Sequence, residues 1–279
     1  MVTIPSYQTI LVERDADGIT TITFNRPEKR NAMNPQLHLD MYDVLNRLEG
    51  DEATRVLVLT GAGPAFCAGQ DLKEYFHELE GQEAERRRIG RISQDWRDRI
   101  LRMFPKPTIA MVNGYCFGGA FTIVCSCDFA IAAEDALFGL SEVNFGHLPG
   151  GLVSKVISGV LAYRDALYYA LTGEPFDGRR AAEIKLVNKA VPREQLREET
   201  WKLARKLATM DASALRITKE ALKQVATMDQ EQAYYWLQAK SNELKWRHEH
   251  EGRGGDGIQR FLAKEYRPGL QSFTEVERA

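Results

Sequence analysis

Three segments of the chain have residue types and spacings from which an active site could be built. The first, Ala65–Tyr75, follows a buried apolar run and places small residues where backbone could approach a ligand closely. The second, Asn113–Thr122, places two adjacent glycines between an expected strand and an apolar helix. The third, Phe138–Gly151, sets Glu142 in an apolar stretch between glycines. Each segment has an ordinary alternative, namely a strand-to-helix turn or a surface loop.

The glycine pair Gly118–Gly119 favours an oxyanion site. A strand that turns into a helix leaves unpaired N–H groups and the positive helix end directed at one point, which suits a developing oxyanion. No third glycine follows at the dinucleotide-binding spacing. Glu142 favours general acid–base chemistry, because a carboxylate in apolar surroundings has a raised pKa. The competing interpretation is a solvated glutamate in a loop.

Other reactive groups give weaker signals. Of the histidines, only His147 is expected near a site, and none accompanies a nucleophile motif such as G-x-S-x-G. A Walker-type phosphate loop is absent from the sequence. Cys125 and Cys127 lack a second pair of ligands at zinc spacing, so core packing is favoured over a metal site.

Composition limits the class of protein. The chain has 279 residues, of which 44% are hydrophobic and 27% charged, enough for one large or two modest domains with a buried core. A net charge of −2 excludes a bulk electrostatic argument for nucleic acid or an anionic membrane as partner. No secretion signal is visible, and no apolar run reaches the ~20 residues of a membrane helix. A cytoplasmic location, with the four cysteines as reduced core residues, is therefore expected.

The elements that must position these segments alternate along the first two thirds of the chain. Apolar runs predict strands, and Asn34–Pro35 predicts the start of a helix that Gly50 ends. From residue 193 onward helical patterns dominate, so we expect an α/β domain over 1–192 and a helical region over 193–279. The expected strands are Ile19–Phe24, Val56–Leu59, Thr108–Val112 and Phe129–Ala132, and the late helices are Arg193–Thr209, Asp211–Thr227, Asp229–His250 and Ile258–Lys264.

A long charged helix is expected before Pro105. Its apolar stripe consists of Ile89, Ile92, Trp96, Ile100 and Met103. Several arginines are expected to lie mostly off this stripe, on a solvated face, rather than to form a phosphate-binding patch. They are Arg86, Arg87, Arg88, Arg91, Arg97 and Arg99.

Taken together and in this order, the motifs resemble the crotonase superfamily of enzymes that act on coenzyme A thioesters. The matching strings are Asn25–Met33, Ala68–Leu72 and Asn113–Gly119. The resemblance implies a spiral of ββα turns followed by C-terminal helices that cover the site and trimerise. It implies a homotrimer or a dimer of trimers, an acyl-CoA substrate, and no metal or redox cofactor, with coenzyme A entering as part of the substrate.

Within that superfamily the chain is most similar to the hydroxycinnamoyl-CoA (feruloyl-CoA) hydratase-lyases. Those enzymes hydrate an aryl-enoyl-CoA and cleave the adduct to an aromatic aldehyde and acetyl-CoA. The strings that carry this similarity are Asp71–Phe76, Lys106–Gly114, Leu140–Asn144 and Tyr266–Leu270. The alternatives are a plain enoyl-CoA hydratase or isomerase of fatty or aromatic acid β-oxidation, and a non-catalytic protein that binds CoA thioesters.

The resemblance implies roles for individual residues. The backbone N–H groups of Gln70 and Gly119 would hold the thioester oxygen, and Glu142 would be the acid/base. Thr122 stands where simple hydratases carry a second glutamate. Tyr75 would contact a phenolic hydroxyl, opposite Gln238. The remaining residues expected to bind substrate are Lys29, Ala32, Ala68, Asp71, Leu72 and Gly146.

Several positions depart from the hydratase-lyase pattern. Gln70 stands in place of a methionine, and Tyr115 and Phe145 in place of tryptophans. Gln238 stands in place of a second phenol-binding tyrosine, and His147–Leu148 replaces an apolar residue followed by proline. Because these changes cluster on the expected acyl pocket, they predict a shifted substrate but leave a backbone oxyanion site unaffected.

Overall fold

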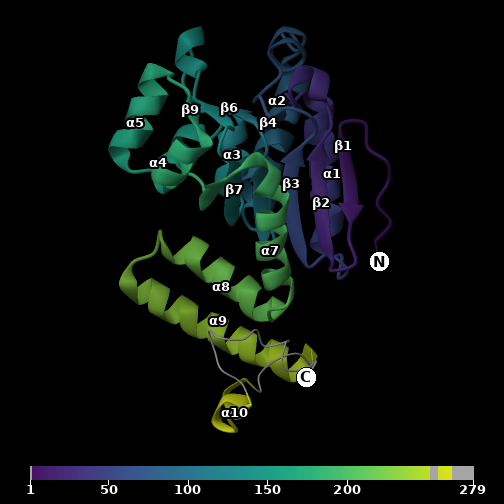
Figure 1. Cartoon of the computed structure of the whole chain (residues 1–279), viewed down its shortest axis with the longest axis vertical. Helices are drawn as coiled ribbons and strands as arrows, with labels where there is room; N and C mark the ends of the chain where they lie inside the picture. Colours follow the sequence, from purple (N-terminus) through teal and green to yellow (C-terminus); the bar gives the residue numbers. More distant parts are fainter. Residues whose placement is uncertain (1, 252–256, 266–279) are drawn as a thin grey trace.

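Two sheets lie side by side in the first two thirds of the chain, as the computed structural model of residues 2–251 and 257–265 shows (Figure 1). The Tyr266–Leu270 string lies outside these described residues. The main sheet has the strand order β1-β2-β3-β5-β7-β10. Its strands are β1 (Ile10–Arg14), β2 (Ile19–Phe24), β3 (Val56–Gly61), β5 (Thr108–Val112), β7 (Phe129–Ala133) and β10 (Lys189–Val191).

The second sheet has the order β4-β6-β8-β9 and explains the spiral. Strands β3, β5 and β7 are each followed at once by a strand of this smaller sheet and then by a helix. Every turn of the chain therefore adds one strand to each sheet, which confirms the predicted ββα spiral. The strands of the second sheet are β4 (Ala65–Cys67), β6 (Tyr115–Phe117), β8 (Leu137–Gly139) and β9 (Phe176–Asp177).

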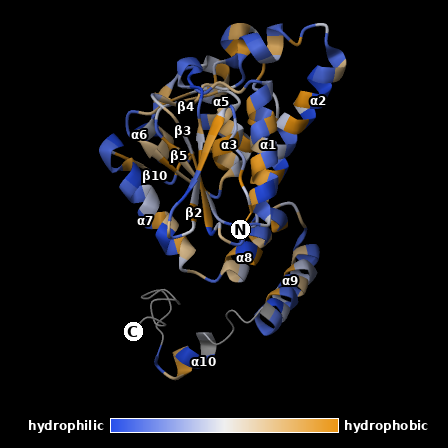
Figure 2. Cartoon of the chain, turned by 90° about the vertical axis from the view of Figure 1, so that its right-hand side faces the viewer, coloured by the Kyte–Doolittle hydropathy of each residue, from blue (hydrophilic) through white to orange (hydrophobic). Residues whose placement is uncertain are grey.

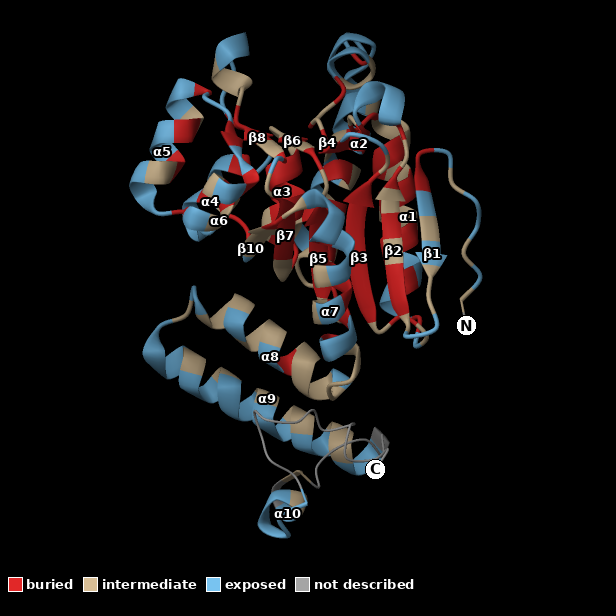
Figure 3. Ribbon diagram, in the orientation of Figure 1, coloured by how far each residue is buried: buried red, intermediate tan, exposed pale blue. Residues whose placement is uncertain are grey.

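The centre of the main sheet is fully buried. Strands β2, β3, β5, β7 and β10 run parallel, and every residue of β3 and β5 is buried (Figure 3). Parallel strands covered on both faces read as continuous apolar runs, which is why they could be located from the sequence. In Figure 2 hydrophobic residues concentrate in these strands and on the helix faces turned toward them.

Helices close the spiral on its outside. The cap of α1 is the predicted one, because the Asn34 side chain accepts a hydrogen bond from the N–H of Leu37 at 2.9 Å. Helix α7 packs against strands β2, β3, β5 and β7. The helices of the spiral and its edge are α1 (Pro35–Glu49), α2 (Glu83–Gln94), α3 (Ala120–Ser126), α4 (Val153–Val160), α5 (Tyr163–Thr172), α6 (Gly178–Glu183) and α7 (Leu196–Ala208).

The arginine-rich helix differs from the prediction at one residue. After α2 the chain continues as a π-helical segment, η3 (Asp95–Leu101). Its i→i+5 turns hold more residues per turn than an α-helix, so they rotate the side chains that follow. Arg97, predicted on a solvated face, is only 3% exposed. That prediction is wrong for Arg97, because its guanidinium donates to acceptors on Ser93, Gly119 and Thr122 in the interior.

Two long helices, α8 (Ala212–Val225) and α9 (Gln230–Glu251), extend from the far end of α7 as an antiparallel pair (Figure 1). A short helix, α10 (Gly257–Leu262), follows. Asp128, beside β7, anchors α8 through Lys219 at 2.7 Å and Lys223 at 2.6 Å. Large apolar side chains on the pair are exposed, among them Leu222, Tyr234, Tyr235 and Trp246. Among the described residues, no helix combines the length and apolar character needed to cross a membrane.

Candidate active site

The three segments singled out in the sequence meet at one edge of the second sheet. Strands β4, β6 and β8 are parallel neighbours, and Ala68–Asp71, Gly118–Gly119 and Leu140–Glu142 follow their carboxyl ends. The carboxyl edge of parallel strands is where α/β proteins place ligands. Segments distant in the sequence are thereby brought to a single site.

Close approach of two loops requires glycine at this edge. Gly69 has φ +89°, and a Cβ there would lie 2.8 Å from the carbonyl oxygen of Phe117. Gly118 has φ +51°, and a Cβ there would lie 3.1 Å from a carboxylate oxygen of Glu142. A larger residue at either position would have a strained backbone, and its side chain would crowd these neighbouring atoms. The loops after β4 and β6 therefore lie against each other, with Glu142 beside them.

The backbone N–H groups of Gln70 and Gly119 lie where these two loops meet. Gln70 pairs with Met33 in a parallel bridge: Met33 N–H donates to the Gly69 carbonyl at 2.7 Å, and Asp71 N–H donates to the Met33 carbonyl at 2.9 Å. The N–H of Gln70 itself therefore points away from Met33. A Cβ on Gly69 would lie 3.4 Å from the Gly119 nitrogen, so the two loops meet there. Within the described residues, neither of these two N–H groups has an acceptor.

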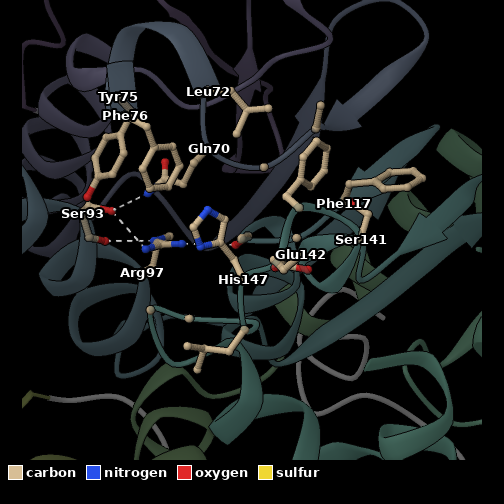
Figure 4. Close-up of a pocket in the computed structure, with 18 of the residues that line it drawn as sticks. Gln70, Leu72, Tyr75, Phe76, Ser93, Arg97, Phe117, Ser141, Glu142 and His147 are labelled. Carbon is tan, nitrogen blue, oxygen red and sulfur yellow. Dashed lines mark hydrogen bonds between the residues drawn. The ribbon is translucent and has the colours of Figure 1, made fainter. Parts of the chain in front are cut away.

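A cavity of about 590 Å³ opens beside these N–H groups (Figure 4). Of the residues predicted to form the site, it is lined by Ala68, Gln70, Leu72, Tyr75, Gly119 and Glu142. His147, which the sequence placed near a site, also lines it. Aromatic rings form much of the rest of the wall, namely Phe76, Tyr115, Phe117 and Phe145.

Glu142 is the carboxylate of this cavity. It begins the short helix η4 (Glu142–Phe145) after β8. Its Oε2 is buried and has no hydrogen-bond partner among the described residues. Burial raises the pKa of Glu142 above its usual value. A carboxyl group with a raised pKa and an uncommitted oxygen is suited to proton transfer.

Two predicted binding residues lie behind the cavity wall. The Asp71 carboxylate accepts hydrogen bonds from the N–H groups of Lys73 (3.1 Å) and Glu74 (3.0 Å), and it pairs with Arg26 at 3.0 Å. It thereby caps the turn that carries Leu72 and Tyr75. Thr122 is fully buried, and its hydroxyl donates to the Gly119 carbonyl at 2.7 Å. Both residues support cavity-lining segments instead of lining the cavity.

Four other residues predicted to bind substrate lie outside the cavity wall of their own chain. Lys29 is exposed on the 3₁₀ turn η1 (Pro27–Lys29), and the Ala32 carbonyl accepts a hydrogen bond from Arg26. Gly146 ends η4 in a left-handed conformation, and the residues on either side of it do line the cavity. Gln238 is exposed on α9. The C-terminal helices therefore do not cover this cavity within one chain, contrary to the expectation.

Arg97 and Ser93 line the cavity, although no pattern in the sequence singled them out. The Arg97 guanidinium donates to the Gly119 carbonyl at 3.2 Å and to the Thr122 hydroxyl at 3.0 Å. It also donates to the backbone carbonyl and to the hydroxyl of Ser93, both at 3.0 Å. Two of its acceptors lie 22 and 25 residues later in the sequence, so periodicity alone could not have found this residue.

A buried chain of hydrogen bonds orients Gln70. Trp96 Nε1 donates to His38 Nδ1 at 3.0 Å, so His38 carries its proton on Nε2 and donates to Gln70 Oε1 at 2.8 Å. Burial lowers the pKa of His38 to about 3, which keeps the ring neutral. The Gln70 amide nitrogen then donates to the Ser93 hydroxyl at 3.4 Å. Gln70, predicted to supply one oxyanion N–H, is thus held in place by its side chain as well.

Comparison with known proteins agrees with this geometry. Residues 14–268 match the sequence family described as enoyl-CoA hydratase/isomerase. The chain belongs to this family. It is 48% identical over 269 residues to a hydroxycinnamoyl-CoA hydratase-lyase of Pseudomonas fluorescens, covering 96% of this chain and 97% of that protein.

Solved structures of the family share the fold. An enoyl-CoA hydratase of Mycobacterium smegmatis superposes with a TM-score of 0.82 at 28% identity, covering 92% of this chain and 97% of that one. A putative enoyl-CoA hydratase of Streptomyces coelicolor A3(2) gives 0.84 at 26% identity, covering 96% and 95%. The predicted crotonase fold is confirmed. No group of three or more His, Cys, Asp or Glu side chains suited to a metal ion occurs among residues 2–251 and 257–265.

Proposed function

We propose that this protein is an acyl-CoA lyase that hydrates the double bond of a para-hydroxycinnamoyl-type CoA thioester and then cleaves the adduct. The observation that carries the proposal is one cavity lined by Gln70, Gly119 and Glu142. The backbone N–H groups of Gln70 and Gly119 have no acceptor among the described residues, and Oε2 of Glu142 is buried there without a partner. The 48% identity to a hydroxycinnamoyl-CoA hydratase-lyase supports the choice of substrate.

Hydration would begin with polarisation of the thioester carbonyl. The two N–H groups hold its oxygen, each contributing about 3 kcal/mol to stabilisation of the developing oxyanion. Charge drawn toward that oxygen makes the β-carbon electrophilic. Water adds to the β-carbon while the Glu142 carboxylate accepts the proton of the water, and the Glu142 carboxyl then delivers that proton to the α-carbon. The product of this step is a β-hydroxyacyl-CoA.

Cleavage would use the same carboxylate as a base and the same two N–H groups to hold the leaving enolate. Glu142, again a carboxylate, removes the β-hydroxyl proton, the C–O bond becomes a carbonyl, and the Cα–Cβ bond breaks. The electron pair of that bond passes to the thioester, which leaves as an enolate held by the Gln70 and Gly119 N–H groups. Protonation of the enolate at carbon gives acetyl-CoA, and the other product is an aromatic aldehyde.

The wall of the cavity supports an aryl acyl group. Phe76, Phe117 and Phe145 line it, and Tyr75 adds a hydroxyl. An aryl ring packs favourably against rings of this kind. The acyl chain would therefore extend from the oxyanion site between these aromatic side chains.

Residues at the rim support binding of the CoA part. Arg30, whose guanidinium lies 4.6 Å from the centre of the Tyr115 ring, adds a positive charge suited to it. Lys29 and Ala32, on the neighbouring turn, are proposed to contact CoA. Gln238 could reach the acyl end only from another copy, so the proposal includes a homotrimer or dimer of trimers. A cytoplasmic location is part of it, in keeping with the four free cysteines.

Turnover of two thioesters by the purified protein tests the proposal. We expect para-hydroxycinnamoyl-CoA to be preferred over crotonyl-CoA by at least about tenfold in kcat/KM, a difference of ~1.4 kcal/mol. Loss of the enoyl absorbance reports hydration, and release of the aromatic aldehyde reports cleavage. The Tyr75→Phe variant should lose part of the preference and retain crotonyl-CoA turnover. Equal turnover of both thioesters, or hydration without aldehyde, would indicate a plain enoyl-CoA hydratase.

A further inference from the structure

Arg97 has one hydrogen-bond donor more than its protein partners use. A guanidinium has five N–H groups. Four of them reach acceptors: the Ser93 carbonyl, the Gly119 carbonyl, the Thr122 hydroxyl and the Ser93 hydroxyl. The fifth belongs to Nη2 and has no acceptor within the part of the chain that the structure describes. Arg97 lines the cavity, and its Nη2 lies 3.5 Å from where a Cβ on Gly151, another lining residue, would stand.

The positive charge of Arg97 also lacks a direct ion pair. Across the described residues, no carboxylate oxygen lies within ion-pair distance of its guanidinium, although the charge of the neighbouring Asp98 acts on it favourably. Arg97 is 3% exposed, so its charge is largely withdrawn from bulk solvent. A buried cation hydrogen-bonded only to neutral acceptors is costly, and an anionic oxygen entering the cavity would offset that cost.

Other hydrogen-bond donors lie beside Arg97 on the same side of the cavity. The Ser93 hydroxyl already accepts from Gln70 and Arg97, so its own hydrogen is available for donation. Gly90, Ser93 and Arg97 lie on one face of successive helical turns and all line the cavity. The Tyr75 hydroxyl is 3.7 Å from where a Cβ on Gly90 would stand. Figure 4 shows Tyr75, Ser93 and Arg97 along the same side of the cavity, away from Glu142.

We propose that Arg97, with Ser93, binds the para-oxygen of the aryl ring and sets the preference for hydroxylated over unsubstituted cinnamoyl thioesters. This inference rests on the proposed function. The ring oxygen is the acceptor that the free Nη2–H requires, and it accepts most strongly as a phenolate because the hydrogen bond then joins two opposite charges. Arg97 thus adds, from within the chain, a polar contact to the ring oxygen on the side of the cavity that Tyr75 also lines.

A positioning role is the competing explanation, because Arg97 also holds the carbonyl of Gly119. The two roles differ in their dependence on substrate. A displaced Gly119 loop would slow every CoA thioester by the same factor. Loss of a bond to the ring oxygen would slow only a substrate that has this oxygen.

The experiment compares para-hydroxycinnamoyl-CoA with cinnamoyl-CoA in the full-length enzyme and in the Arg97→Gln, Arg97→Lys and Arg99→Gln variants. Arg99 is the matched control, since it lies on the same helical segment, is exposed and pairs with Asp95. We expect Arg97→Gln to reduce the ratio of the two kcat/KM values by about tenfold or more, the usual effect of a charged hydrogen bond. Arg97→Lys should restore part of the ratio, and Arg99→Gln should leave it unchanged.

A spectroscopic arm tests the inference without changing Arg97. In the Glu142→Gln protein, which should bind without turnover, para-hydroxycinnamoyl-CoA is expected to absorb at longer wavelength than in buffer, because a phenolate conjugated with the enoyl thioester absorbs to the red of the phenol. An unchanged spectrum together with an unchanged ratio in Arg97→Gln would overturn the inference. Failure of the wild-type protein to consume either thioester would instead overturn the proposed function.

Discussion

Among single residues, two polar groups of the cavity are buried without a full set of partners. Glu142 and Arg97 both line one cavity, and each has polar atoms that no described side chain or backbone group satisfies. Such groups lower stability in the free protein. Their presence in the cavity is explained if a substrate supplies the missing partners.

Substitution of Glu142 by glutamine should reduce turnover and raise stability. Loss of the acid/base should lower kcat by about 10²–10⁴-fold. Because the folded-state pKa is raised, ionisation of Glu142 opposes folding as pH rises through that pKa, so the uncharged amide should increase the free energy of unfolding at neutral pH. Steady-state kinetics and thermal unfolding measure the two effects. A variant with normal kcat would remove Glu142 from the mechanism.

Asp98 provides a pH-dependent prediction away from the cavity. Both its carboxylate oxygens lack partners among the described residues, and burial raises its pKa from 3.8 to about 6. The stabilising protonated form is lost as pH rises from ~4 to ~6. Asp98→Asn should therefore be more stable than wild type near pH ~8, by about 1 kcal/mol once partial solvent screening is taken into account, and much less so near pH ~4.

The control for Asp98 is its neighbour Asp95. Its hydrogen bonds to Arg99 lower the pKa of Asp95, so Asp95→Asn should not gain stability at high pH. Urea unfolding at the two pH values measures both variants. An Asp98→Asn curve that tracks wild type at every pH would contradict the argument.

Among the elements, short connections decide where the functional atoms lie. The short segment η3 carries the buried Arg97, and the loops after β4, β6 and β8 bring two N–H groups and one carboxylate to a common edge. None of these loops is long. Their positions follow from the strands that precede them.

The Gly119 N–H can be tested with a matched pair of substitutions. Gly119 has φ −55°, which proline can adopt, so Gly119→Pro removes the donor at modest cost to the backbone. Loss of one oxyanion donor should lower kcat by about 10²–10³-fold. Gly119→Ala adds a Cβ close to Met33 (3.1 Å) and Arg97 (3.2 Å) but retains the N–H, and should retain far more activity. Equal losses in both variants would indicate crowding and not the donor.

In the molecule as a whole, the α8–α9 pair extends away from the spiral with exposed apolar side chains. Figure 3 shows that most of its residues are exposed or of intermediate burial. Leu222 is 70% exposed and Tyr235 is 64% exposed. Exposed rings and aliphatic chains on adjoining helices are typical of an interface between subunits.

The proposed trimer predicts the behaviour of a double variant. Leu222→Glu with Tyr235→Glu should place charges in the interface and convert the assembly to a monomer of 31.6 kDa. Light scattering after size-exclusion chromatography measures the mass. The control is Ser241→Glu, an exposed polar position on α9 that the helical period turns away from Tyr235, and it should leave the mass unchanged. An unchanged mass in the double variant would place the interface elsewhere.

Local patterns were enough to predict four strands of the main sheet (β2, β3, β5 and β7), the cap of α1 and the three segments that meet at the cavity. Buried parallel strands are continuous apolar runs, Asn34–Pro35 caps a helix by local hydrogen bonding, and Gly69 and Gly118 satisfy backbone conformations that other residues avoid. Each of these signals lies within a few neighbouring residues, so it can be read from the order of amino acids. The family could be recognised because the motifs follow one another in a characteristic order.

Which side chains meet was settled by the packing of distant segments. The fold places Thr122 and Asp71 behind the cavity wall, Gln238 outside it, and Arg97 in it. The burial of Arg97 depends on acceptors contributed by Gly119 and Thr122, 22 and 25 residues later. Contacts of this kind depend on how helices and strands pack against one another, and no local pattern of residues encodes them.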